Sequence, residues 1–162
     1  MILQRTRAWI GRGFRAGAAT GIGLLAAACS GSSSSTTTPS QSQTFTTEIF
    51  TGTVPAPVNG VLQSAMNNFS VGQGGGQISV TLTSAVETLP DGSLLATVAV
   101  GLGVGTPSGT TCSLLGNGFT IAQAGSAAQL SGSVQAGSYC TQVSDVTNQL
   151  GPVAYAVAVT HP

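Results

Sequence analysis

The sequence predicts an all-β domain over residues 44–162, built as a sandwich or barrel of eight or nine short strands. Apolar residues alternate with small or polar ones in several stretches, among them 78–82, 96–102 and 153–159. A period of two is typical of antiparallel strands that bury one face and leave the other in water. Clusters of glycine, proline and asparagine separate these stretches and mark the turns between strands.

The strands follow one another closely along the domain. We expect them near residues 45–53, 67–72, 77–86, 93–103, 110–115, 118–123, 127–134, 138–146 and 152–161. The stretch 55–65 lacks the alternation. Val58, Val61 and Leu62 are spaced as in a single helical turn, which would cover one end of the sandwich.

The N-terminal part has a different composition from the predicted domain. All four basic residues of the chain lie there, Arg5, Arg7, Arg12 and Arg15, and an apolar run over 16–28 follows them. A run of thirteen residues is too short for a comfortable bilayer span. A positive segment, a short apolar core and then small residues indicate a secretory signal peptide, expected to be helical, over residues 1–28.

The apolar run ends at Leu25-Ala26-Ala27-Ala28-Cys29. This stretch resembles the lipobox of bacterial lipoproteins, although Ala26 stands where leucine is commoner. The resemblance implies that Cys29 is lipidated and becomes the first residue after cleavage. The alternative is an ordinary Ala-x-Ala cleavage site with Cys29 as a bystander. A free thiol on an exported chain is a redox liability, which favours lipidation.

The stretch after Cys29 is rich in serine and threonine. Residues 30–43 read SGSSSSTTTPSQSQ and include no apolar side chain, so they cannot bury surface to offset the entropy of ordering. We expect a disordered, flexible linker over 29–43. In lipoproteins, a residue other than aspartate after the cysteine, here Ser30, favours the outer membrane where the cell has one. The predicted location is therefore the cell envelope, with the membrane as partner through the lipid.

Several pieces of the domain resemble a known bacterial family. The stretches SVTLTS, ATVAVGLG, TTCSLL, GSYCTQVSDVTN and VAYAVAVTHP, in this order, look like the pre-peptidase C-terminal domain and its lipoprotein relatives. The resemblance covers about 50–162 and implies a jelly-roll-like β-sandwich that binds or assists. Family members usually accompany a secreted peptidase, and this chain has none. Some relatives bind calcium through acidic clusters near the domain start, where this chain has Glu48 alone.

Two cysteines remain in the domain, Cys112 and Cys140. In an exported chain a disulfide between them is the expected state, and free thiols are the alternative. Two cysteines without a nearby histidine cannot complete a tetrahedral zinc site. We therefore predict a disulfide, no metal site and no cofactor.

Few residues of the domain could carry catalysis. The domain contains no lysine or arginine, one histidine and four acids. His161 is expected to be a solvated residue at a fraying strand tip. Asp91 is expected to cap a Pro-Asp-Gly turn, and Asp145 to be a turn or backbone-bonding residue. Glu48 and Glu87 are expected on the wet face. No arrangement of these groups indicates an active site, so we predict that the chain is not an enzyme.

Two glycine-rich stretches, 72–76 and 101–105, lack the surroundings of nucleotide-binding loops and are interpreted as turns and strand kinks. Nucleic acid is excluded as a partner, because the domain has no basic residue to neutralise phosphates. The aromatic residues Phe69, Tyr139 and Tyr155 are in phase with apolar neighbours and are expected in the core. Phe45, Phe50 and Phe119 remain as candidates for stacking on sugars.

The sequence thus favours a non-catalytic, lipid-anchored envelope protein that presents a β-sandwich to another envelope protein, a matrix or a polysaccharide. A carbohydrate- or matrix-binding module is the alternative. A hydrolase accessory protein or an enzyme is a distant third.

Overall fold

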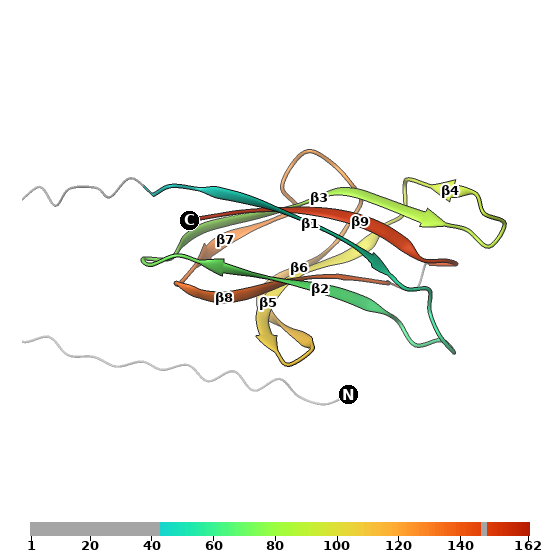
Figure 1. Cartoon of the computed structure of the whole chain (residues 1–162), viewed down its shortest axis with the longest axis horizontal. Helices are drawn as coiled ribbons and strands as arrows, with labels where there is room; N and C mark the ends of the chain where they lie inside the picture. Colours follow the sequence, from blue (N-terminus) through green and yellow to red (C-terminus); the bar gives the residue numbers. More distant parts are fainter. Residues whose placement is uncertain (1–42, 147–148) are drawn as a thin grey trace, which may run out of the picture. The chain divides into compact units, whose positions relative to one another are not determined.

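The computed structural model describes residues 43–146 and 149–162, which form two antiparallel β-sheets arranged as layers (Figure 1). The predicted all-β class is confirmed. The predicted signal-peptide helix, Cys29 and the linker lie outside the described residues, except for Gln43. The strands are β1 (Thr46–Val54), β2 (Ser64–Val71), β3 (Gly76–Thr88), β4 (Leu94–Leu95), β5 (Val100–Ser108), β6 (Thr111–Ala122), β7 (Leu130–Val134), β8 (Gly137–Ser144) and β9 (Val153–His161).

The strand order in the two sheets is that of a jelly roll. Sheet I has the order β1-β9-β3, and both β7 and β4 pair with the free edge of β3. Sheet II has the order β2-β8-β5-β6. Only the β3–β4 and β5–β6 connections stay within one sheet. Because the chain otherwise passes from one layer to the other, strands distant in sequence become neighbours.

The core lies between the two sheets and follows the alternation in the sequence. In β9, every second residue from Val153 to Val159 is buried, and the residues between them are more accessible. Phe69, Tyr139 and Tyr155 all lie in the core, as predicted. The fully buried apolar side chains include Val54, Val80, Leu82, Val100, Leu102, Val143, Val153, Val157 and Val159.

Some predicted boundaries were wrong for identifiable reasons. The two strands expected at 110–115 and 118–123 are one strand, β6, which pairs with β5 on both sides of a register shift between Gly103 and Gly105. The strand expected at 93–103 is divided into β4, in sheet I, and the start of β5, in sheet II. Periodicity alone does not reveal where a strand leaves one sheet for the other.

The segment between β1 and β2 has no helical turn. Val58 and Val61 instead exchange backbone hydrogen bonds around Asn59-Gly60. Both turn residues have positive φ, 53° for Asn59 and 75° for Gly60. Two consecutive left-handed residues are typical of a tight hairpin turn, and asparagine followed by glycine tolerates them at low cost.

The two ends of the domain lie together. The Gln43 side chain donates a hydrogen bond of 2.6 Å to the carbonyl oxygen of Gly75 in the β2–β3 turn. The carbonyl oxygen of Pro162 accepts one of 3.1 Å from the N–H of Gly72 in the same turn. The chain therefore enters and leaves the domain at the same end of the sandwich.

Candidate binding face

The outer face of sheet II is the candidate functional site, and the strand register determines which residues form it. Gly101, Gly103 and Gly105 alternate along β5 and point away from the core, because Leu102 and Val104 between them are buried in it. On one side of β5, these glycines pair with Ile121, Phe119 and Leu114 of β6. On the other side, they pair with Ser144, Gln142 and Cys140 of β8.

The glycines allow the large side chains of β6 to lie across β5. A Cβ atom added to Gly101 would lie 2.9 Å from Cε2 of Phe119, and one added to Gly103 would lie 2.6 Å from Cδ2 of Leu114. These separations are too short for real carbon contacts. Any larger residue at these two positions would therefore displace the Phe119 or Leu114 side chain, and only glycine leaves room for both.

The result is an apolar surface that is partly supported and partly exposed. The exposed fractions are 61% for Ile121, 48% for Phe119 and 39% for Leu114. We call these three side chains the β6 platform. None of the four acids of the domain belongs to the β2, β8, β5 or β6 strands, and the domain has no lysine or arginine. The face that carries the platform is therefore uncharged.

Polar side chains border the platform on the β8 side. A Cβ atom on Gly101 would also collide with Oγ of Ser144, and one on Gly103 would lie 3.6 Å from Cβ of Gln142. Ser144 and Gln142 thus flank the same two glycines as the platform. Both are half-buried, and within the described residues neither side chain makes a hydrogen bond. Their donors and acceptors are free for an external group.

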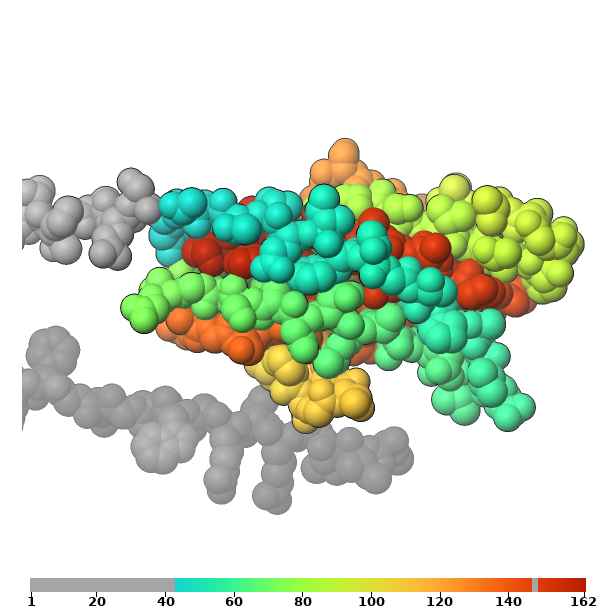
Figure 2. All heavy atoms as spheres, in the orientation of Figure 1, coloured from blue at the N-terminus to red at the C-terminus, as the bar shows by residue number. Residues whose placement is uncertain are grey.

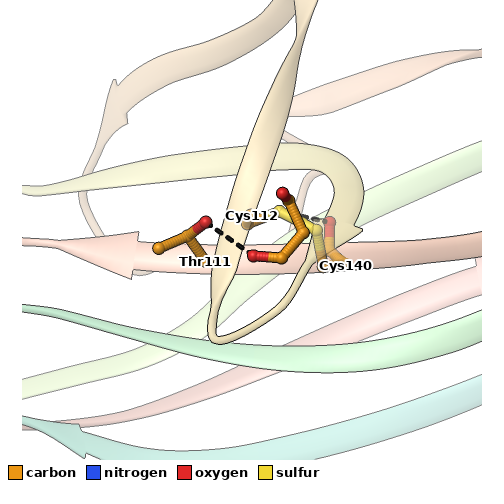
Figure 3. The surroundings of a disulfide bond; sticks show 4 residues. Thr111, Cys112 and Cys140 are labelled. Carbon is orange, nitrogen blue, oxygen red and sulfur yellow. Dashed lines mark hydrogen bonds between the residues drawn. A yellow bond between two sulfur atoms is a disulfide. The ribbon is translucent and has the colours of Figure 1, made fainter.

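The predicted disulfide between Cys112 and Cys140 is present and supports this face (Figure 3). It joins β6 to β8, the two strands that flank β5 in the strand order, with the two Cα atoms 5.9 Å apart. At the turn of the β5–β6 hairpin, the Thr111 hydroxyl donates a hydrogen bond of 2.9 Å to the carbonyl oxygen of Ser108. The hairpin tip projects beyond sheet II, on the side away from sheet I (Figures 1 and 2).

His161 does not lie where the sequence analysis expected it. The prediction of a solvated terminal residue is wrong, because the His161 side chain is only 6% exposed. Its ring packs against Phe69 with 5.5 Å between ring centroids. Its Nε2 lies 2.8 Å from Oε1 of Glu48. The pair holds the last residues of β9 against β1 at the end where the chain enters the domain.

Glu87 is also misplaced in the prediction. It was expected on the wet face, but it is buried at the end of β3. Its Oε1 accepts backbone hydrogen bonds from the N–H of Leu150 and, at 2.8 Å, from the N–H of Gly151. A buried carboxylate with two backbone donors is satisfied within the protein, and here it fixes the loop before β9.

The remaining acids lie apart from these pairs. Asp91 caps the β3–β4 turn as predicted, and its Oδ1 accepts hydrogen bonds from the N–H and the hydroxyl of Ser93. Asp145 is buried directly after β8, and its N–H donates to the carbonyl oxygen of Gln63. In residues 43–146 and 149–162, no three histidine, cysteine, aspartate or glutamate side chains gather as a metal site would require.

A hollow of about 270 Å³ lies where β3 and β7 of sheet I face β5 and β6 of sheet II; its apolar lining is Ile78, Val80, Val104, Leu115, Leu130 and Val134. Within the part of the chain that the structure describes, no helix has the length and hydropathy needed to cross a bilayer.

Of the three aromatic residues that the sequence left as sugar-stacking candidates, one lies on this face. Phe119 is part of the β6 platform, whereas Phe45 is exposed just before β1 and Phe50 is half-buried on β1 and packs against the core. Leu114, Ile121, Gln142 and Ser144 were not foreseen. The signal for them was the alternation of three glycines at 101, 103 and 105, which leaves one face of a central strand without side chains.

Comparisons with known proteins do not assign the chain. No protein-family model matches it, and no curated protein matches it with statistical significance.

Proposed function

We propose that this chain is a non-catalytic lipoprotein of the bacterial cell envelope, held through a lipid on Cys29, that binds another envelope component through the outer face of sheet II. The observation that carries the binding role is the β6 platform. Its three large apolar side chains are exposed on an uncharged sheet face, next to polar side chains with free hydrogen-bonding groups. An exposed apolar patch with a polar border marks an interaction site on a soluble domain.

The sequence around Cys29 supports the anchoring role. The apolar run over 16–28 ends at this cysteine, and the following residues are small and polar. Each buried CH₂ group of an acyl chain contributes ~0.8 kcal/mol to membrane binding, so two or more chains hold a protein firmly. Ser30 favours the outer membrane where one exists. The resemblance to the pre-peptidase C-terminal domain, whose members bind or assist, supports a non-catalytic role.

Metabolic labelling tests the anchor. Cells that express the full chain are grown with an alkyne fatty acid, and the purified protein is examined by mass spectrometry and by membrane fractionation. We expect acyl mass on Cys29 and recovery in the membrane fraction. Cys29→Ser should lose both. The double variant Cys112→Ser, Cys140→Ser is the matched control and should keep the label. Acyl-free wild-type protein in the soluble fraction would contradict the anchor.

Site-specific photo-crosslinking in cells tests the binding face. A photoreactive residue at Phe119 is compared with one at Ile49, which is 69% exposed on β1 of the other sheet. We expect a discrete crosslinked product from position 119 and none from position 49. Equal products from the two positions would mean that the outer face of sheet II has no special role.

A further inference from the structure

We infer that the β6 platform, with Gln142 and Ser144, binds an extended, uncharged polysaccharide. This inference rests on the proposed binding role of the same face and names its ligand class. The observation behind it is the match between two surfaces. A pyranose ring presents a face of C–H groups surrounded by hydroxyl groups. The outer face of sheet II presents aliphatic and aromatic side chains beside an amide and a hydroxyl.

The apolar half of the site is flat because of the glycines of β5. Phe119 lies over Gly101 and Leu114 lies over Gly103, so both side chains extend along the sheet instead of standing away from it. Ile121 continues this surface along β6. Aromatic and aliphatic side chains on a flat sheet can pack against the C–H faces of successive sugar rings and remove both surfaces from water.

The polar half of the site supplies directional contacts. Ser144 and Gln142 occupy alternate positions on β8, so both point to the outer face, and they are separated from the platform by the width of one strand. Neither side chain makes a hydrogen bond within the described residues. A sugar packed on the Phe119 and Leu114 side chains would bring its hydroxyl groups toward Gln142, whose amide donates and accepts, and toward Ser144, whose hydroxyl does the same.

The charge of the domain favours neutral polysaccharides over anionic ones. Residues 43–162 include four acids and no lysine or arginine, so an anionic polymer meets repulsion and no cation. A neutral polysaccharide meets no such repulsion and needs no cation.

A second copy of the protein could also cover an apolar sheet face. The half-buried polar side chains with free donors favour the sugar, because face-to-face packing of two sheets would bury these groups without partners.

Affinity electrophoresis tests the ligand class. The full chain, purified in detergent, is run in native gels that contain hydroxyethyl cellulose, a soluble mixed-linkage β-glucan or dextran, with alginate as the anionic probe. We expect retardation by at least one neutral polymer and none by alginate. Phe119→Ala should weaken retardation about tenfold, which corresponds to ~1.4 kcal/mol. Phe45→Ala is the matched control, since it removes an equally exposed phenyl ring elsewhere.

A second variant, Gln142→Ala, and a measurement of thermal unfolding separate a loss of binding from a loss of folding. Gln142→Ala leaves the platform intact and should weaken retardation while thermal unfolding stays unchanged. Retardation by alginate alone, or retardation that Phe119→Ala and Gln142→Ala leave unaltered, would overturn the inference. The inference would also be overturned if no polymer retarded the protein and the protein formed a concentration-dependent dimer that Phe119→Ala dissociates. The labelling of Cys29 is independent of these outcomes, so the anchor and the ligand class can fail separately.

Discussion

Asn67 on β2 donates a hydrogen bond of 2.9 Å to the hydroxyl of Tyr155 on β9, and this bond connects the two sheets through the core. Tyr155 is buried and Asn67 is half-buried. The Tyr155 ring also occupies the space over its register partner Gly52, where a Cβ atom would lie 2.8 Å from Cζ. One tyrosine thus positions β1, β9 and β2 together.

Tyr155→Phe should lower the free energy of unfolding by about 1 kcal/mol, because the Asn67 amide loses its acceptor while the packing of the ring is retained. Urea unfolding monitored by circular dichroism measures the change. In the Tyr155→Phe background, Asn67→Leu should cost less than it does in the wild type. If the losses in free energy of unfolding of the two single variants simply add in the double variant, the hydrogen bond contributes nothing to stability.

The buried carboxylate of Glu87 should be essential for the loop before β9. Glu87→Ala leaves the backbone N–H groups of Leu150 and Gly151 without their acceptor and should destabilise the domain by about 2–4 kcal/mol. Glu87→Gln keeps one acceptor oxygen of the same shape and should cost clearly less. Thermal unfolding of the two variants measures this difference. Equal losses of stability in the two variants would show that the two backbone hydrogen bonds are unimportant.

The disulfide should stabilise the sandwich substantially. Replacing Cys112 and Cys140 together by alanine opens a link between residues 28 apart in sequence, for which the chain-entropy model gives a loss of about 3–4 kcal/mol. Urea unfolding of the wild type with and without a reducing agent should show a similar difference. Alkylation of the unreduced, unfolded chain should modify neither cysteine, and modification of either would contradict the bond.

The glycines of β5 should differ sharply in their tolerance of substitution. A Cβ atom at Gly103 meets the far end of the flexible Leu114 side chain, so Gly103→Ala should change stability by less than about 1 kcal/mol while it displaces Leu114. A Cβ atom at Gly105 would collide with the backbone carbonyl of Ser113, which cannot move aside. Gly105→Ala should therefore destabilise the domain by about 2 kcal/mol or more. Comparable melting temperatures for the two variants would refute this account.

Asp91 gives the domain one predictable response to acid. Hydrogen bonds from the Ser93 hydroxyl and then from the Ser93 N–H lower the pKa of Asp91 below its ordinary value of 3.8. Because the pKa is lower in the folded state, the contribution of Asp91 to stability is present above pH 3.8 and is lost as the pH falls through the folded-state pKa. NMR titration of the Asp91 carboxyl group should give a midpoint below 3.8, and Ser93→Ala should raise it. An unchanged midpoint in Ser93→Ala would exclude the hydroxyl as the cause.

Much of the sandwich was predictable because its strands keep a strict alternation. The strands around 78–82 and 153–159 and the turn at 72–76 needed no knowledge of their partners. The burial of His161 and Glu87, in contrast, could be predicted only with knowledge of the residues that contact them. His161 is buried by Phe69 and paired with Glu48, residues that lie 92 and 113 positions away in the chain. Likewise, only the register of β5 with β6 shows that the glycines at 101 and 103 leave room for Phe119 and Leu114.

The place where the chain enters β1 determines how the domain bears a load applied through its N-terminal end. Tension applied at Gln43 passes into β1, whose nine residues pair in register with β9 from Thr46–His161 to Val54–Val153. A pull along the axis of β1 strains the bonds of this ladder in parallel, as shear, and does not open them one after another. A domain held by sheet II and pulled from this end should therefore resist detachment by force better than one loaded across its strands.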